Sequence, residues 1–221
     1  MFNRGTGLFF SRCALAKNDE RVTNGFVERN HAKVRIALGD AVLAANGQYH
    51  HFFRERNRRI VAGLAKTPPH WKKLVEWHTQ GTAFKLSPRH TATDVEMLKA
   101  TQVELAEVWL STFLWLESKH LGRSFETASA YATTGERLFP ETPRIRNVLL
   151  RIRDRRSRGG ALPGWPDYPR AALLRVLVRL VDPSVEPDTA MASKGLGAHL
   201  ANNATWVELE SVYARWWAYY N

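Results

Sequence analysis

The sequence predicts an all-α protein, a multi-helix bundle of about seven to nine helices with no substantial sheet. Three observations lead to this prediction. Apolar residues recur at spacings of three, four and seven positions over several long segments, which is the period of an amphipathic helix. Capping residues precede several of these segments, and glycines follow them. No segment shows sustained alternation of apolar and polar residues between hairpin turns.

The N-terminal half contains the clearest helical patterns. Residues 1–25 are expected to form an N-terminal extension, and the first helix is expected over 26–46, where one apolar stripe ends at an Asn-Gly pair. A second helix is predicted over 52–64. A third is predicted to begin at Thr67 as N-cap, with Pro68 in its first turn, where the missing N–H costs nothing.

The longest helix is predicted over 93–120, because Thr93 and Glu96 have the spacing of a capping box. A short helix is expected over 125–134. Another is expected over 142–156, opened by a Thr-Pro pair. The apolar residues of this last helix share one face, which is predicted to be buried: Ile145, Val148, Leu149 and Ile152.

Residues 161–169 contain three prolines and are predicted to form a Pro-rich loop. The C-terminal helices are expected within 170–221. Asp167 is predicted to cap a helix that runs to Val181, and Thr205 with Glu208 is predicted to form a capping box at the start of the final helix. Because the length suits one core of ordinary size, residues 26–221 are expected to be a single domain.

Charge and cysteine content limit the classes of partner and compartment. The 32 Lys and Arg residues exceed the 21 Asp and Glu residues, which gives a net charge of +11. Such a surface attracts nucleic acid, nucleotides, anionic lipid or an acidic protein, and charge alone does not choose between them. The single cysteine, Cys13, excludes an intrachain disulfide, and no apolar segment approaches the ~20 residues of a membrane span. A cytoplasmic protein without a membrane partner is therefore expected.

An arginine-rich helix is the most distinctive local feature. Guanidinium groups match the geometry of phosphate oxygens, so these side chains are candidates for binding an anion, and the alternative is a solvated basic face. A second arginine cluster follows the first helix. The candidate anion-binding residues are Arg144, Arg146, Arg151, Arg153, Arg155, Arg156 and Arg158, with Arg54, Arg58 and Arg59.

Candidates for catalysis are weaker. Asp40 lies on a largely apolar helix and needs a partner, since an unpaired buried carboxylate is costly; Tyr49 or an arginine is expected to supply it. Asp40 is then either a structural tie or part of a site with Tyr49, His50 and Lys85. The strong catalytic and nucleotide-binding motifs are absent. We therefore expect a non-catalytic protein and predict no metal site and no cofactor.

Three stretches resemble a known family. They are residues 35–50 (RIALGDAVLAANGQYH) running into 54–59 (RERNRR), residues 82–88 (TAFKLSP), and residues 116–125 (LESKHLGRSF) leading to Tyr131. Together, over about residues 26–160, they resemble the helical region that follows the catalytic head in a group of bacterial nucleotidyltransferase-like proteins.

The resemblance implies a helical domain that packs beside a nucleotidyltransferase fold and helps to shape its substrate cleft. The Gly-Ser turn and the Asp-x-Asp pair of that family's catalytic head do not occur in this sequence. The expected function is therefore binding of an anionic partner, a nucleic acid or a nucleotide. The alternative is an accessory role beside a nucleotidyltransferase head that is missing or carried by a partner protein.

Overall fold

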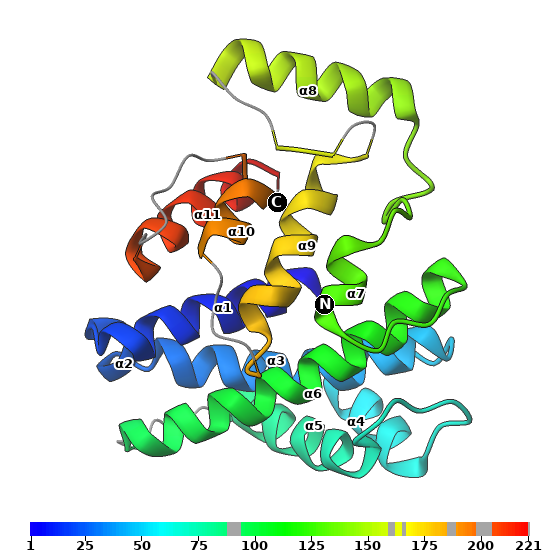
Figure 1. The fold of residues 1–221 in the computed structure, drawn as a ribbon. Helices are drawn as coiled ribbons and strands as arrows, with labels where there is room; N and C mark the ends of the chain where they lie inside the picture. Colours follow the sequence, from blue (N-terminus) through cyan, green and yellow to red (C-terminus); the bar gives the residue numbers. More distant parts are fainter. Residues whose placement is uncertain (88–93, 159–161, 165–166, 185–188, 198–204, 221) are drawn as a thin grey trace. The chain divides into compact units, whose positions relative to one another are not determined.

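Figure 1 shows the fold in a computed structural model of the 221-residue chain. The structure describes residues 1–87, 94–158, 162–164, 167–184, 189–197 and 205–220. Over these residues it is all-α, without a strand, which confirms the predicted fold class. The helices are α1 (Phe2–Lys17), α2 (Glu20–Thr23), α3 (Phe26–Ala45), α4 (Phe53–Ala62), α5 (Trp71–Leu86), α6 (Val95–Leu121), α7 (Ala128–Thr133), α8 (Arg144–Arg158), α9 (Pro169–Val181), α10 (Thr189–Gly195) and α11 (Trp206–Tyr220).

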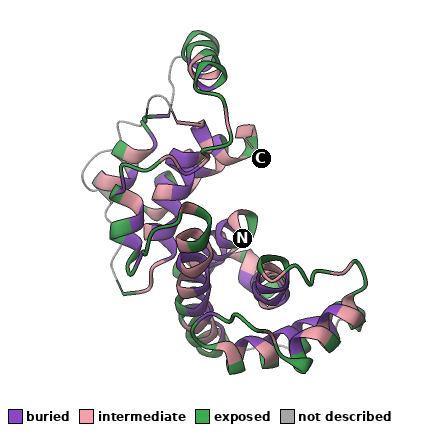
Figure 2. Cartoon of the chain, turned by 90° about the vertical axis from the view of Figure 1, so that its right-hand side faces the viewer, coloured by how far each residue is buried: buried purple, intermediate pink, exposed green. Residues whose placement is uncertain are grey.

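The chain divides into two compact units, Met1–Phe125 and Glu126–Asn221. The sequence predicts a single domain over 26–221. Its composition gives no sign of this division, because the short connection after α6 is rich in neither proline nor glycine. In both units most helices are buried along one side and exposed along the other, whereas α9 is buried over most of its surface (Figure 2). None of the described helices is long and apolar enough to cross a membrane.

The first unit is built around α3, which packs against α1, α2, α4, α5 and α6. Most of the apolar stripe predicted for this helix is buried: Val27, Leu38 and Val42 have no exposed surface, whereas Ala45 at its C-terminal end is exposed. The facing helices supply the rest of the core: Leu8 and Phe9 from α1, Leu74 from α5, and Leu105 and Trp109 from α6.

Gly39 lets α3 approach its neighbours closely. A Cβ atom at this position would lie 2.5 Å from Cδ1 of Ile60 in α4 and 2.6 Å from Cδ2 of His78 in α5. Because real Cβ atoms do not come this close to other heavy atoms, a larger residue would push the helices apart. The glycine thereby brings the next residue, Asp40, within reach of both α4 and α5.

Residues 1–25 do not form the expected extension. α1 packs against α3 and α6, and Leu8, Phe9 and Cys13 have no exposed surface. The basic residues Arg4 and Arg12 interrupt the apolar run in the sequence, but they lie on the more exposed side of the helix. Residues 2–17 therefore have the period of an amphipathic helix, although they contain no continuous apolar run.

The predicted start of the third helix is wrong. α5 begins at Trp71, and its N-cap, His70, has a left-handed backbone with φ 61°. A start at Thr67 is unfavourable because Pro68 is followed by Pro69, and a residue that precedes proline is disfavoured in the α conformation. The Pro-Pro pair therefore delays the start by one turn.

The long helix begins at Val95. Asp94 is its N-cap and accepts a hydrogen bond from the Glu96 backbone at 3.2 Å, whereas Thr93, the predicted cap, lies outside the described residues. The neighbouring helices α4 and α7 occur where they were predicted, with bounds that differ by one to three residues.

The second unit is built around α9, which packs against α7, α8, α10 and α11. Pro169 occupies its first turn, but the N-cap is Tyr168 and no side chain caps the helix. The predicted cap, Asp167, faces Arg137 and Arg175 instead, at 3.7 and 3.4 Å. The prediction of a cap at Asp167 is therefore wrong, because two arginines compete for this carboxylate.

The C-terminal helices were predicted in part. α10 was not expected, since the sequence around it is rich in breakers. At the start of α11, the backbone N–H of Thr205 donates to Oε2 of Glu208 at 2.7 Å, and the Glu208 N–H donates to Oγ1 of Thr205 at 3.4 Å. These two bonds confirm the predicted capping box.

Candidate anion-binding surface

Helix α8 turns a different face to the protein from the one that its sequence predicts. Ile145, Leu149 and Ile152 were expected to be buried, but they are 77%, 60% and 38% exposed. Val148 is half-buried. The predicted burial of this apolar face is therefore wrong.

Polar residues form the buried face of α8. Asn147, Arg151 and Asp154 have no exposed surface, and their spacing of four and three residues places them on one side of the helix. Buried polar groups of this kind need partners, because an unpaired one is costly. The partners come from loops and from the C-terminal helix, which sequence spacing alone does not reveal.

Arg151 binds the Pro-rich loop. Its Nε and Nη2 atoms donate to the carbonyl oxygen of Asp167 at 3.0 and 2.9 Å, and its Nη1 donates to the carbonyl oxygen of Leu162. Burial lowers the pKa of Arg151 from its usual value, and the nearby Tyr220, Asp167 and Asp154 oppose this shift. Arg151 therefore holds α8 to the loop. Because its donors are engaged by loop carbonyl oxygens, we do not count it among the anion-binding residues.

Asp154 gathers three donors. It accepts hydrogen bonds from the hydroxyl of Tyr219 at 2.8 Å, from the hydroxyl of Tyr220, and from Arg153 at 3.2 Å. The Asp154 hydrogen bond raises the pKa of Arg153, and burial followed by the Asp154 hydrogen bond raises that of Tyr220. Arg153 is thus already paired with a carboxylate.

Four arginines of α8 remain available to an anion. Arg144, Arg146, Arg155 and Arg156 are exposed, and in the part of the chain that the structure describes none of them makes a hydrogen bond or an ion pair. The Arg158 side chain lies outside the described part. We define the α8 surface as the four exposed arginines together with the exposed apolar residues Ile145, Leu149 and Ile152.

The second arginine cluster is largely neutralised. Arg58 and Arg59 both bind Glu55, at 2.7 and 2.8 Å, and their hydrogen bonds lower the pKa of Glu55 to about 2. Arg59 also donates to the carbonyl oxygen of Gln48 at 2.8 Å. Arg54 is exposed. The cluster therefore offers fewer unpaired cations than its sequence predicts.

Asp40 is at the centre of a network between α3, α4 and α5. Its carboxylate binds Nη1 of Arg56 and lies 3.2 Å from Nε2 of His78. Arg56 is only 4% exposed, and its guanidinium stacks on the rings of Phe53 and Tyr49 at 4.1 and 5.1 Å. An arginine was among the expected partners of Asp40, and the structure identifies it as Arg56.

His78 has no ring nitrogen left for proton transfer. Its Nε2 faces Asp40, and its Nδ1 lies 3.1 Å from the side-chain amide of Asn57. The single hydroxyl hydrogen of Thr79 lies within reach of two acceptors, Oδ1 of the same Asn57 amide at 3.0 Å and the carbonyl oxygen of Val75 at 3.1 Å. With both nitrogens engaged and the ring fully buried, the arrangement ties three helices together.

The structure brings together only two of the four weak catalytic candidates. The hydroxyl of Tyr49 lies 3.3 Å from Nη1 of Arg56, the same atom that binds Asp40. His50 stacks on His51 with ring centroids 4.3 Å apart and accepts a hydrogen bond from the backbone of Phe52 at 3.2 Å. Lys85 is exposed in the last turn of α5.

Neither metal geometry nor comparison with known proteins assigns a function. Among the described side chains, no three His, Cys, Asp or Glu residues lie close enough to hold a metal ion. No family model, curated protein or solved structure matches the chain. The resemblance to nucleotidyltransferase-like proteins stays a prediction.

Sequence reasoning missed a set of basic residues around a cavity in the second unit. Arg175 and Arg179 are four residues apart within the apolar run 171–181 of α9, so both project from the same side of the helix. Lys194 lies on α10, which was not predicted. The sequence did contain a signal for this site, namely two arginines at this spacing within an apolar run. A cation on a buried helix indicates that a polar or charged partner faces it.

Proposed function

We propose that the chain is a non-catalytic binding module whose α8 surface binds an anionic partner, in the first place the phosphate backbone of a nucleic acid. The main support is the exposure of Arg144, Arg146, Arg155 and Arg156 without partners in the described part of the chain. Guanidinium groups donate to phosphate oxygens in a geometry that lysine does not match. The net charge of +11 attracts the same class of partner over a longer range.

The spacing of these arginines suits a polyanion better than a single phosphate. Arg144 and Arg155 are eleven positions apart, which is roughly 16 Å along a helix at about 1.5 Å per residue. One strand of a nucleic acid carries a phosphate every ~3.4 Å in a duplex, so this length corresponds to about five phosphates. A short oligonucleotide can therefore contact both ends of α8.

The state of the catalytic candidates supports a binding role over an enzymatic one. Asp40 is committed to Arg56 and His78, and both ring nitrogens of His78 are engaged. A general base needs a nitrogen or oxygen that can reach the substrate proton.

The test replaces Arg144, Arg146, Arg155 and Arg156 with glutamine. A matched control replaces Lys33, Lys66, Lys72 and Lys85, four exposed lysines of the first unit, with glutamine, so that both variants lose four charges. Binding of labelled single-stranded RNA and duplex DNA is measured by fluorescence anisotropy. We expect the arginine variant to bind roughly a hundredfold more weakly than the control variant. Equal affinity of the two variants contradicts the proposal.

A second candidate is an accessory role beside a partner protein that carries a nucleotidyltransferase head. The exposed Ile145, Leu149 and Ile152 favour it, because apolar side chains bordered by arginines are typical of protein interfaces rather than of phosphate contacts. Replacing these three residues with serine separates the candidates. If α8 binds nucleic acid, the variant keeps its affinity within about twofold. If α8 docks on a nucleotidyltransferase head, binding to that partner is lost with the apolar contacts.

A further inference from the structure

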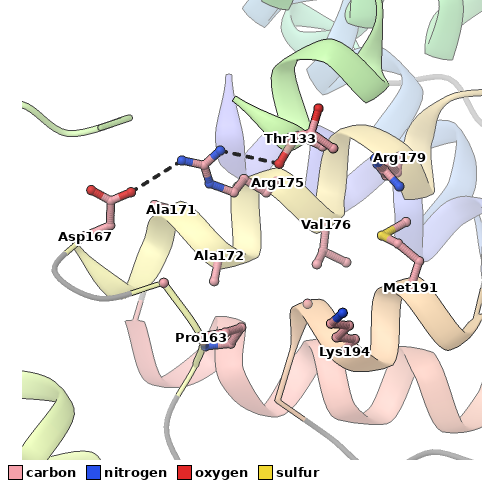
Figure 3. Close-up of a pocket in the computed structure, with 13 residues that line it drawn as sticks. Thr133, Pro163, Asp167, Ala171, Ala172, Arg175, Val176, Arg179, Met191 and Lys194 are labelled. Atoms are coloured by element: carbon pink, nitrogen blue, oxygen red, sulfur yellow. Dashed lines mark hydrogen bonds and ion pairs between the residues drawn. The ribbon is translucent and has the colours of Figure 1, made fainter. Parts of the chain in front are cut away.

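A cavity of about 370 Å³ lies within the second unit, between α9, α10, the end of α7 and the Pro-rich loop (Figure 3). Its volume falls in the range of small-molecule sites. At about 30 Å³ for each water molecule in the liquid, it corresponds to roughly a dozen water-sized groups. The cavity therefore suits a small organic molecule.

Small and apolar side chains form the wall of the cavity along α9 and α10. Ala171 and Ala172 leave room because they end at Cβ, and Val176 and Met191 complete the wall. Pro163 closes one end from the loop, which Arg151 holds through its hydrogen bonds to loop carbonyls. A ligand with an apolar body would exclude water from this wall, which is favourable.

Among the described residues that line the cavity, three are cations and one is a carboxylate, Asp167. Arg175 is already committed: it donates to the carbonyl oxygens of Thr134 and Glu136 at 2.6 and 2.8 Å and lies 3.4 Å from Asp167. It therefore fixes the end of α7 and the loop against α9. The charge that remains for a ligand comes from the other two cations.

Arg179 and Lys194 are the under-coordinated cations. Arg179 donates through Nη2 to the Ser129 hydroxyl at 3.2 Å, but its Nε is buried and has no hydrogen-bond partner among the described atoms. Lys194 is exposed and makes no hydrogen bond or ion pair with any described residue. Figure 3 shows the two side chains coming from facing helices, Arg179 from α9 and Lys194 from α10.

We infer that this cavity is a binding site for a small amphipathic anion, a carboxylate on an aliphatic or aromatic body of about eight to ten carbons. The apolar body lies against Ala172, Val176 and Met191, and the carboxylate accepts hydrogen bonds from Arg179 and Lys194. This site is separate from the α8 surface and does not depend on the function proposed for it.

The test uses the full chain and a series of simple probes. Octanoate is compared with butanoate, with octanol as a neutral analogue and with octylammonium as a cationic one, by calorimetric titration and thermal shift. We expect octanoate to bind and to raise the melting temperature, with affinity increasing from butanoate to octanoate. Octanol should bind at least tenfold more weakly, because its hydroxyl accepts hydrogen bonds without the negative charge of a carboxylate, and octylammonium should not bind. Equal binding of octanoate and octylammonium, or no binding of octanoate, overturns the inference.

Two variants locate the site. Lys194→Gln should weaken octanoate binding about tenfold and leave octanol binding unchanged, and Ala172→Leu should weaken both by filling the cavity. Lys194 is exposed, so its replacement does not disturb folding. Lys85→Gln, with the same charge change in the first unit, should bind octanoate like the wild type. If Lys194→Gln and Ala172→Leu both bind like Lys85→Gln, the ligand lies elsewhere and the inference fails.

Discussion

At the scale of single residues, the described structure shows buried polar side chains whose partners come from distant parts of the chain. His31 is 4% exposed, and its Nε2 lies 2.9 Å from the amide of Gln102, which in turn donates to the carbonyl oxygen of Leu8 at 3.1 Å. Asp40 similarly joins Arg56 and His78. Asp40 links α3 directly to α4 and α5, and the His31–Gln102 pair links α3 to α6 and α1, so replacing Asp40 or His31 should act on stability first.

His31 makes stability depend on pH. Burial lowers its pKa from 6.5 to about 4, against the raising effect of the Gln102 hydrogen bond. Between these two values the unfolded chain binds a proton that the folded chain does not, so the free energy of unfolding falls as pH is lowered through this window. The loss is up to about 3 kcal/mol.

Urea unfolding at pH 7.0 and pH 4.5 checks this prediction against His31→Gln, which keeps a hydrogen-bonding group and does not titrate. The wild type should lose about 2 to 3 kcal/mol more than the variant over this interval. The same pH dependence in both proteins would show that the pKa of His31 is the same in the folded and unfolded chain, against the lowered pKa.

Asp40→Ala should be strongly destabilising. The substitution leaves the guanidinium of Arg56 buried without its carboxylate, and breaking such a pair typically costs about 3 to 5 kcal/mol. Chemical denaturation measures the loss. A matched control, Asp94→Ala, removes only the exposed N-cap of α6 and should cost about 1 kcal/mol. A similar, small effect of both substitutions would contradict the structural role of Asp40.

At the scale of the elements, α8 separates what can be predicted from what cannot. Its existence and its bounds to within two residues follow from the Thr-Pro pair and the helical period. The orientation of α8 does not follow from its sequence. Apolar and polar residues lie on opposite faces of the helix, and the face that is buried is decided by contacts with Leu162, Asp167, Tyr219 and Tyr220. These partners are more than ten positions away along the chain.

The candidate site, like α8 itself, was predicted only in part. The sequence named the arginines of α8, but it could not separate exposed ones such as Arg155 from the buried Arg151. The helix α3 and its stripe were predicted correctly, since Leu38 and Val42 follow a simple period with ordinary apolar neighbours. Prediction failed where polar groups are buried, because their partners come from loops and ends that carry no periodic signal.

Arg151→Met tests the role of the buried face of α8. The substitution leaves the carbonyl oxygens of Leu162 and Asp167 without their donor, so we expect a loss of about 2 to 4 kcal/mol in the free energy of unfolding. Arg155→Met, on the same helix but exposed, should change it by less than about 0.5 kcal/mol. Urea unfolding distinguishes the two. If Arg151→Met is as mild as Arg155→Met, the loop does not depend on this arginine.

At the scale of the whole molecule, the division into Met1–Phe125 and Glu126–Asn221 gives each unit its own core. Leu38 and Leu177 are fully buried in the first and second unit. Leu38→Ala and Leu177→Ala should each cost about 2 to 5 kcal/mol.

Scanning calorimetry of these variants tests whether the units unfold separately. Each substitution should lower the melting temperature of one transition and leave the other unchanged. A single transition that shifts equally in both variants would show that the two cores unfold as one.

The dependence of nucleic-acid affinity on salt tests most directly that the α8 surface binds phosphates. Four arginine contacts predict that log affinity for duplex DNA falls against log salt with a slope of about −3.6, and for single-stranded RNA with about −2.8. The variant with glutamine at 144, 146, 155 and 156 should bind weakly with a slope near zero. A wild-type slope near zero, or an unchanged slope in this variant, would contradict phosphate binding by α8.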